Sequence, residues 1–248
     1  MITFSNVNLR FKDLVVMENF CEEFEENKIN CILGPSGCGK TTLLNLLSGI
    51  LEEDSGQITK PKSVSYVFQE ESLVPQKTAR KNLELVLKSV YEDKAELREI
   101  IDKFLKISDL EKAADLYPHE MSGGMRQRLA LIRAFAYPSE ILLMDEPFKA
   151  LDITLRDSLI KSFINLYEKD KRTVLFVTHD IDEALMTGDF IYIYSNKPLN
   201  LQRKFAVEES KYRRKLYSDS ITKIKNEIYK ETEKWQTPKQ ETGISEHE

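Results

Sequence analysis

Hydrophobic and polar positions follow two patterns that alternate along the chain. Short apolar runs are typical of strands buried on both faces of a sheet, and apolar residues repeated every three to four positions predict helices. The expected strands cover residues 2–9, 15–24, 29–33, 64–68, 141–144, 173–177 and 190–194. The expected helices cover residues 42–49, 78–87, 94–107, 123–137, 153–169, 181–187 and 218–235. This alternation predicts an α/β fold whose parallel sheet is covered by helices on both faces.

The strand signals are interrupted once, which suggests how the chain is divided. Only helical spacing is found from residue 72 to residue 137, so we expect a helical insertion (72–137) between two parts of a core, 1–71 and 138–200. The first two strands are expected to form an N-terminal antiparallel element. Residues 201–248 are more polar, and we expect them to add one amphipathic helix and a polar tail to a main domain that ends near residue 200.

Composition and charge exclude several classes of protein. The chain has 248 residues, a net charge of −5 and no concentrated basic face, so no nucleic-acid partner is expected. No apolar run approaches the roughly 20 residues needed to cross a bilayer, and the N-terminus lacks a basic segment followed by an apolar core. We therefore expect neither a transmembrane segment nor a signal peptide. The odd number of cysteines, without metal-ligand spacing, fits a reducing cytoplasm.

A glycine-rich segment between the expected strand 29–33 and the helix after it fits the phosphate-loop pattern G-x-x-x-x-G-K-[ST]. It consists of Gly34, Pro35, Ser36, Gly37, Cys38, Gly39, Lys40, Thr41 and Thr42. Its glycines let successive backbone N–H groups surround a polyphosphate, and the helix points its positive end at the same anion. Lys40 supplies positive charge to the outer phosphates, and the Thr41 hydroxyl is placed to bind magnesium. The alternative is a glycine-rich turn with a solvated lysine, but the full context predicts that the chain binds a nucleoside triphosphate.

Two carboxylates, Asp145 and Glu146, follow the apolar strand 141–144. In a parallel sheet they emerge at the same edge as the phosphate loop. Asp145 is therefore placed to hold magnesium through water, opposite Thr41, and Glu146 to polarise a water for attack on the γ-phosphorus. On their own, two exposed carboxylates after a strand would be unremarkable; the phosphate loop in the same chain favours the catalytic interpretation.

Three further side chains are candidates for the same site. Gln69 and His179 each follow an expected strand, so we expect Gln69 to contact the metal or water and His179 to contact the γ-phosphate. A neutral histidine can still donate, because one ring nitrogen always carries hydrogen. Phe11 lies in a turn before the phosphate loop, where it could stack on adenine or belong to the core.

A second anion site is predicted at Ser122-Gly123-Gly124, which opens the helix 123–137. A serine cap and two glycines leave N–H groups and the positive end of the helix dipole for an anion. The alternative is an ordinary N-cap with flexible glycines. One phosphate does not need two helix N-termini of the same chain, so a second copy of the protein is the economical user of this one.

Together these residues resemble the ATP-binding-cassette (ABC) family over about residues 2–194. The segments that carry the resemblance are Gly34–Thr42 (Walker A), Leu142–Glu146 (Walker B), Gln69 (Q-loop), Ser122–Met125 (signature), Ala150–Asp152 (D-loop), His179 (switch histidine) and Phe11 (A-loop aromatic). The resemblance implies a P-loop NTPase core of the RecA-like kind, with ATP and Mg²⁺ as ligands. It also implies a head-to-tail dimer with two ATP molecules at the interface. Lys40, Gln69, Ser122, Glu146, Asp152 and His179 would then act in hydrolysis.

The amino-acid sequences of segments 117–128 and 146–152 are similar to those of bacterial importer ATPases of the nitrate, sulfonate, taurine and pyrimidine-precursor group. That resemblance implies integral membrane permease partners, an extracytoplasmic substrate-binding protein and a peripheral location at the cytoplasmic face of the membrane. The segment 70–81 is the expected dock for the membrane partner. The chain departs from the group at Gln76, where tryptophan is frequent, and at Lys149, where a small residue is common; Met125 replaces the glutamine of the general signature, as is usual in this subgroup.

Two other functions are compatible with an ABC cassette. A soluble ATPase of DNA repair or translation usually carries coiled-coil insertions, tandem cassettes or basic patches, and none is visible in the sequence. An exporter half commonly carries its membrane domain in the same chain. The importer interpretation is therefore preferred.

Overall fold

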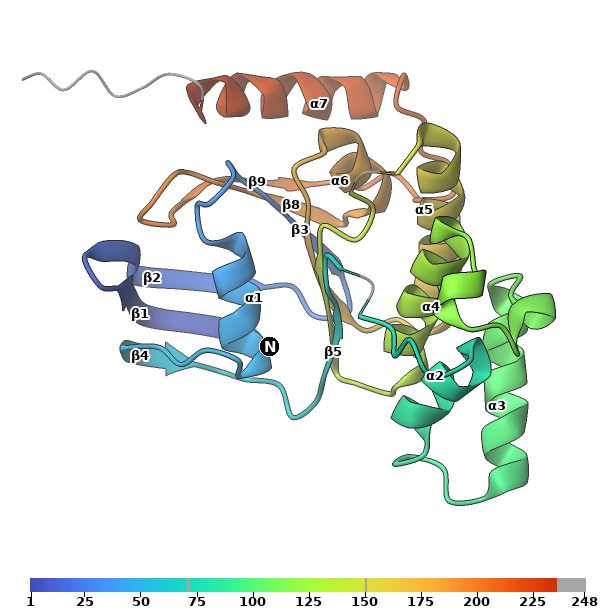
Figure 1. Ribbon diagram of the computed structural model, residues 1–248. Helices are drawn as coiled ribbons and strands as arrows, with labels where there is room; N and C mark the ends of the chain where they lie inside the picture. The colour runs from blue at the N-terminus through green and yellow to red at the C-terminus, as the bar shows by residue number, and fades with distance from the viewer. Residues whose placement is uncertain (71, 150, 236–248) are drawn as a thin grey trace, which may run out of the picture.

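A six-stranded sheet forms the centre of the fold in a computed structural model that describes residues 1–70, 72–149 and 151–235 (Figure 1). Its strand order is β5-β6-β7-β3-β8-β9. The strands are β3 (Ile29–Leu33), β5 (Val64–Val67), β6 (Ile141–Asp145), β7 (Thr173–Val177), β8 (Phe190–Tyr194) and β9 (Leu201–Ala206). The first five strands in this order run parallel, as expected. β9 was not expected, and it adds an antiparallel edge next to β8.

A second sheet of three antiparallel strands lies beside the first, in the order β2-β1-β4. It contains β1 (Ile2–Phe11), β2 (Leu14–Phe24) and β4 (Ser55–Ile58). The expected N-terminal antiparallel element is thus confirmed, but β4 is an addition to it. The sequence Ser-Gly-Gln-Ile gives no strand signal, because three of its four residues are exposed.

Helices cover both faces of the central sheet. α1 (Lys40–Ser48) packs between the two sheets, and its leucines share one apolar cluster with β1 and β2. The opposite face packs against a larger cluster. Its helices are α2 (Ala79–Leu87), α3 (Lys94–Ile107), α4 (Gly123–Ala136), α5 (Ile153–Lys169) and α6 (Ile181–Thr187). Alternate residues of β6 enter the two clusters, Leu142 and Met144 on one side and Ile141 and Leu143 on the other, which is why the strand is apolar throughout.

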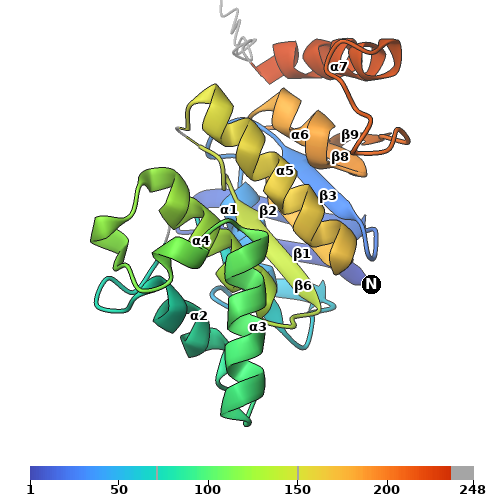
Figure 2. The same ribbon diagram turned by 90° about the vertical axis from the view of Figure 1, so that its right-hand side faces the viewer.

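Between β5 and β6, the regular elements of the described residues are all helices. They are α2, α3, α4 and the short 3-10 helices Glu111–Ala113 and Pro118–Glu120. α2, α3 and α4 lie together at one end of the molecule in both views (Figures 1 and 2). The division of the chain at residues 72 and 137 stays a prediction. Ala150 and the tail 236–248 lie outside the described residues. Among those described, no helix combines the length and apolar character that crossing a membrane requires.

The expected C-terminal amphipathic helix is present as α7 (Asp219–Thr232), continued by the 3-10 helix Glu233–Trp235. Its apolar side buries Ile221 and Ile228 against the rest of the chain. Arg203 of β9 pairs with Glu227 and Glu231 of α7, and Lys225 pairs with Asp182 of α6. The helix therefore packs on α6 and β9, as Figure 1 shows.

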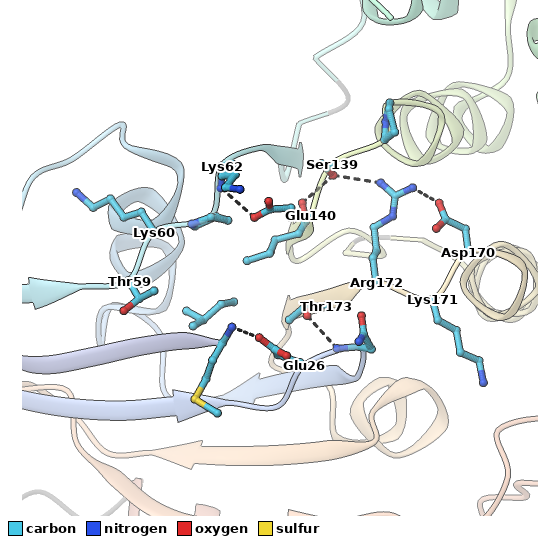
Figure 3. A pocket seen from close by; sticks show the side chains of 16 residues that line it. Glu26, Thr59, Lys60, Lys62, Ser139, Glu140, Asp170, Lys171, Arg172 and Thr173 are labelled. Atoms are coloured by element: carbon cyan, nitrogen blue, oxygen red, sulfur yellow. Dashed lines mark hydrogen bonds and ion pairs between the residues drawn. The ribbon is translucent and has the colours of Figure 1, made fainter.

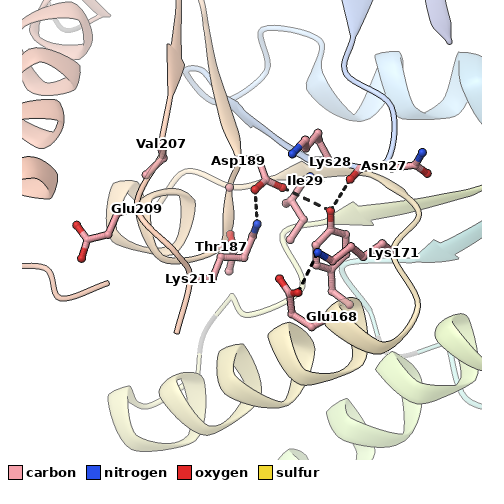
Figure 4. Close-up of polar contacts among 12 residues, drawn as sticks. Asn27, Lys28, Ile29, Glu168, Lys171, Thr187, Asp189, Val207, Glu209 and Lys211 are labelled. Atoms are coloured by element: carbon pink, nitrogen blue, oxygen red, sulfur yellow. Dashed lines mark hydrogen bonds and ion pairs between the residues drawn. The ribbon is translucent and has the colours of Figure 1, made fainter. Parts of the chain in front are cut away.

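The segment between β9 and α7 is fastened to the core by buried charges. The Lys211 ammonium pairs with Asp189, whose other carboxylate oxygen accepts a hydrogen bond from the Ile29 backbone at the start of β3 (Figure 4). The buried Arg214 guanidinium donates to four backbone carbonyl oxygens, those of Leu185, Gly188, Val207 and Glu209, at 2.6–2.9 Å. Two of these carbonyls belong to the C-terminal end of α6 and the residue that caps it. Arg214 thus joins the C-terminal extension to α6.

We expect Arg214→Met to lower the free energy of unfolding by roughly 2–4 kcal/mol, because buried carbonyl groups lose their donor. The matched control is Arg213→Met, since Arg213 is exposed beside it and should change stability by less than about 0.5 kcal/mol. Urea denaturation followed by circular dichroism measures both. Equal midpoints for the two variants would contradict the role given to Arg214.

Candidate functional site

The candidate site lies where four neighbouring parallel strands end. β5, β6, β7 and β3 are adjacent in the sheet and run in the same direction, so the segments that follow them emerge at one edge. This edge carries the phosphate loop after β3, Asp145 and Glu146 at the end of β6, and His179 after β7. Such an edge is the usual position of ligand sites in α/β folds.

The phosphate loop has the backbone geometry that its glycines predict. Gly37 and Gly39 have φ of 76° and 120°, in the region that favours glycine. A Cβ atom on Gly39 would lie 2.9 Å from Val16 Cγ1, so space also excludes a side chain there. α1 begins directly after Gly39 with no side-chain cap and no acidic residue in its first turn. Its N-terminal N–H groups and positive dipole are therefore available to an anion.

Lys40 is folded into this loop. Its side chain is largely buried, and its ammonium donates to the carbonyl oxygens of Gly34 and Pro35 at 2.8 and 2.9 Å. The loop thus holds a desolvated positive charge beside the uncapped helix end. A phosphate oxygen accepts a charge-assisted hydrogen bond from lysine more strongly than a neutral carbonyl does.

Thr41 and Asp145 meet as expected. The Thr41 hydroxyl donates to Asp145 Oδ2 at 2.8 Å. Burial raises the pKa of Asp145, and the hydrogen bond from Thr41 opposes that shift. A hydroxyl and a carboxylate oxygen in contact suit Mg²⁺, which usually takes few protein ligands and completes its shell with phosphate and water. The residues present therefore fit the ion.

Gln69 is not brought into this pair. It is exposed just after β5, and in the described part of the chain no hydrogen bond links its side chain to Thr41 or Asp145. Its place in the metal site stays a prediction.

Glu146 and His179 are also brought together. Glu146 Oε1 lies 3.4 Å from His179 Nδ1, and Glu146 has φ of 46°, unusual for a residue other than glycine. The Glu146 amide donates to the Val177 carbonyl at 2.9 Å. The pairing of β6 with β7 therefore fixes the backbone at the start of the turn that contains Glu146. Lys149, which the sequence did not single out for this site, has its Nζ 2.6 Å from Glu146 Oε2.

The pKa of Glu146 lies below its ordinary value. Burial opposes ionisation of this carboxyl, but the hydrogen bond from Lys149 and the charges of His179 and Lys149 outweigh it. Glu146 is therefore a carboxylate at neutral pH and can accept a proton.

Ser122, Gly123 and Gly124 start α4, on the opposite face of the sheet from α1 (Figure 1). Ser122 caps the helix by accepting from the Met125 amide at 3.3 Å, and Ser122 and Gly123 are exposed. Gly124 has a packing reason of its own, since a Cβ atom there would lie 2.5 Å from Leu155 Cδ1. These three residues do not join the phosphate loop within one copy of the chain.

Two further candidates are separate from the catalytic cluster. Phe11 is 44% exposed at the end of β1, so the core alternative is wrong and the ring is free to stack. Asp152 caps α5 by accepting from the Leu155 amide at 2.9 Å. Its contribution to hydrolysis stays a prediction.

A polar hollow of about 620 Å³ lies at the other edge of the sheet, around Arg172, Glu140 and Lys62 (Figure 3). Polar side chains of the hollow bond within it: Arg172 pairs with Asp170 and donates to Ser139, and Glu140 accepts from the Lys62 backbone amide. It gathers none of the predicted catalytic residues. We therefore place the functional site at the edge formed by the strand C-termini.

Comparison with known proteins finds similar sequences over most of the chain. Residues 17–149 match the family model described as ABC transporter. The chain is 36% identical over 229 residues to the aliphatic sulfonates import ATP-binding protein SsuB of Bacillus cereus, covering 88% of this chain and 89% of the relative. It is 38% identical over 194 residues to the nitrate import ATP-binding protein NrtD of Synechococcus elongatus, covering 74% and 71%.

Two solved structures are similar throughout their length. The dimeric ABC transporter cassette MJ0796 superposes with a TM-score of 0.73 at 29% identity, covering 85% of this chain and 100% of that one. A dimeric post-hydrolysis state of the same cassette, bound to ADP and phosphate, gives 0.71 at 28% identity with the same coverage.

We expect Lys40→Met to weaken Mg-ATP binding by about 10- to 100-fold, which corresponds to the loss of a hydrogen bond to a charged group. Lys28→Met is the matched control, because Lys28 is exposed at the opposite end of β3 and should leave binding unchanged. Isothermal titration calorimetry with each folded variant makes the comparison. A wild-type affinity for Lys40→Met would remove Lys40 from the phosphate site.

Proposed function

The chain belongs to the ABC transporter family of ATP-binding proteins, and we propose that it is the ATP-hydrolysing subunit of an importer. In this proposal, hydrolysis of Mg-ATP drives uptake through partner membrane subunits. The observation that carries it is the gathering of the phosphate loop, the Thr41–Asp145 pair and the Glu146–His179 pair at one sheet edge. The import role rests on the relatives SsuB and NrtD, whose names describe import ATP-binding proteins.

ATP binds with its phosphates in the loop. Lys40 exchanges the Gly34 and Pro35 carbonyl oxygens for phosphate oxygens, and the amides at the start of α1 donate to the same group. Phe11 stacks on the adenine. Thr41 and Asp145, with Gln69, hold Mg²⁺, which supplies neutralising charge to the phosphates when bound.

Glu146 and His179 act on the attacking water and the γ-phosphate. The Glu146 carboxylate accepts the proton that water loses as its oxygen attacks phosphorus. His179 donates a ring N–H to the γ-phosphate oxygen. The 3.4 Å between Glu146 Oε1 and His179 Nδ1 supports these neighbouring roles.

The site is completed by a second copy of the chain. The exposed start of α4 lies on the face of the sheet opposite α1, and its Ser122–Gly124 segment reaches the γ-phosphate bound by another copy. Asp152 lies near that interface. The solved structures of the MJ0796 cassette, which are dimers, support the pairing of two copies.

The remaining partners are permease subunits in the membrane and an extracytoplasmic substrate-binding protein. The exposed part of the segment 70–81 is the proposed dock for a permease at the cytoplasmic face of the membrane; residue 71 is outside the described part of the chain. A soluble ATPase of DNA repair or translation is the weaker proposal, because the relatives quoted above are named as import proteins.

We expect Glu146→Gln to retain ATP binding and to lower turnover by about 10²–10⁴-fold, the usual contribution of a positioned base. The control is Glu99→Gln on the exposed side of α3, which should leave turnover unchanged. Phosphate release under saturating Mg-ATP measures both variants. If Glu146→Gln turned over as fast as the wild type, another group would have to be the base.

A further inference from the structure

The residues on either side of His179 are fastened by buried hydrogen bonds that the chemistry above does not use. Thr178 and Glu183 are 1% and 5% exposed. The Thr178 hydroxyl donates to Glu183 Oε2 at 2.6 Å and accepts from the Asp180 amide at 3.0 Å. The same hydroxyl therefore links the residue before His179, the residue after it and the first turn of α6.

Asp180 is held from two more directions. Its Oδ1 accepts from the amides of Asp182 and Glu183 at 2.7 and 3.1 Å, which caps α6, and its Oδ2 accepts from Arg156 of α5 at 2.7 Å. The Thr178 amide donates to the Ile32 carbonyl of β3 at 3.2 Å. His179 itself is half exposed. The His179 backbone is thus fixed on both sides, and its ring lies beside Glu146 with about half of its surface open to a ligand.

Burial of the Glu183 carboxyl group is unfavourable for the stability of the fold. Burial is the main cause that raises its pKa to about 7, and the nearby Asp180 charge adds to this, whereas the Thr178 hydrogen bond, Arg156 and His179 oppose it. A buried carboxyl contributes less to stability than an apolar side chain of similar size would. A short hydrogen bond to Thr178 does, however, give one defined geometry to the segment that carries His179.

We propose that Glu183 is a positioning residue for hydrolysis, which holds the Thr178 hydroxyl and thereby aims His179 at the γ-phosphate. This inference rests on the function proposed above, in which His179 contacts that phosphate. It assigns Glu183 no contact with ATP. Because a misplacement of about 1 Å can reduce turnover by up to 10²-fold, loss of the clamp should act on the chemical step.

Four single variants separate the hydrogen bond from the space it fills. Glu183→Met and Thr178→Val remove the acceptor and the hydroxyl with little change of volume, and each should lower kcat about tenfold with KM for Mg-ATP within about twofold of the wild type. Glu183→Gln and Thr178→Ser keep the acceptor and the hydroxyl and should retain most of kcat. Asp182→Asn is the control on the same helix, because it removes the pairing with Lys225 without touching Thr178, and it should leave kcat unchanged.

The decisive measurement repeats Glu183→Met and Thr178→Val in a His179→Ala background, using phosphate release by folded protein of matched thermal stability. A residue that acts only through His179 adds nothing once the imidazole is gone, so we expect both variants to lose their effect there. A fold-wide effect would instead lower kcat by the same factor in both backgrounds. If Glu183→Met did not fold, Thr178→Val would test the same hydrogen bond alone.

The outcomes distinguish this inference from the proposed function. If His179→Ala alone kept wild-type turnover, the role of His179 in the proposed function would be wrong. If His179→Ala lowered turnover but Glu183→Met and Thr178→Val left kcat unchanged, or lowered it equally without His179, the positioning role of Glu183 would be overturned.

Discussion

The common direction of β5, β6, β7 and β3 is the constraint on which the rest of the site depends. Parallel backbone pairing brings the ends of these strands to one edge of the sheet. Backbone hydrogen bonds between neighbouring segments continue past the last residues of the strands. The Glu146 amide bonds to Val177, and the Thr178 amide bonds to Ile32. The proposed catalytic side chains are therefore positioned by backbone pairing that continues from the sheet.

The same edge of the sheet has a positive electrostatic potential that favours an anion. The uncapped start of α1 and the buried ammonium of Lys40 provide positive potential, and the nearby carboxylates each have a partner. Thr41 holds Asp145, whereas His179 and Lys149 flank Glu146. Such preorganised charges need little rearrangement when phosphate charge moves during hydrolysis, which is the main way that proteins accelerate phosphoryl transfer.

The sequence predicted the parts of the fold that have strong apolar patterns. The five parallel strands and the helices were found because each has a continuous apolar run or an apolar side, whereas β4 and β9 were missed. Both are edge strands in which most residues are exposed. They therefore show neither a continuous apolar run nor a regular repeat of apolar residues. The convergence of Thr41 with Asp145 and of Glu146 with His179 followed from strand direction alone.

Side-chain contacts beyond this convergence could not be predicted from the sequence. The pairing of Lys149 with Glu146 depends on a turn with positive φ at Glu146, and the bond between Thr178 and Glu183 depends on how α6 starts. For Gln69, the sequence predicted the position after β5 correctly. In the described structure, however, no hydrogen bond joins its side chain to Thr41 or Asp145. Motif spacing indicates which residues share an edge; packing decides which of them touch.

We propose that one copy of the chain supplies only half of each hydrolytic site; α1 and α4 pack on opposite faces of the sheet. The most direct measurement mixes two variants that we expect to be inactive alone, Lys40→Met and Ser122→Arg, and follows phosphate release at an Mg-ATP concentration that fills the wild-type site but not the Lys40→Met site. Half of randomly formed dimers would contain one of each, and each mixed dimer would keep one intact site, so turnover should recover to about a quarter of the wild-type value. No recovery above the separate variants, or full turnover by Ser122→Arg alone, would contradict the account.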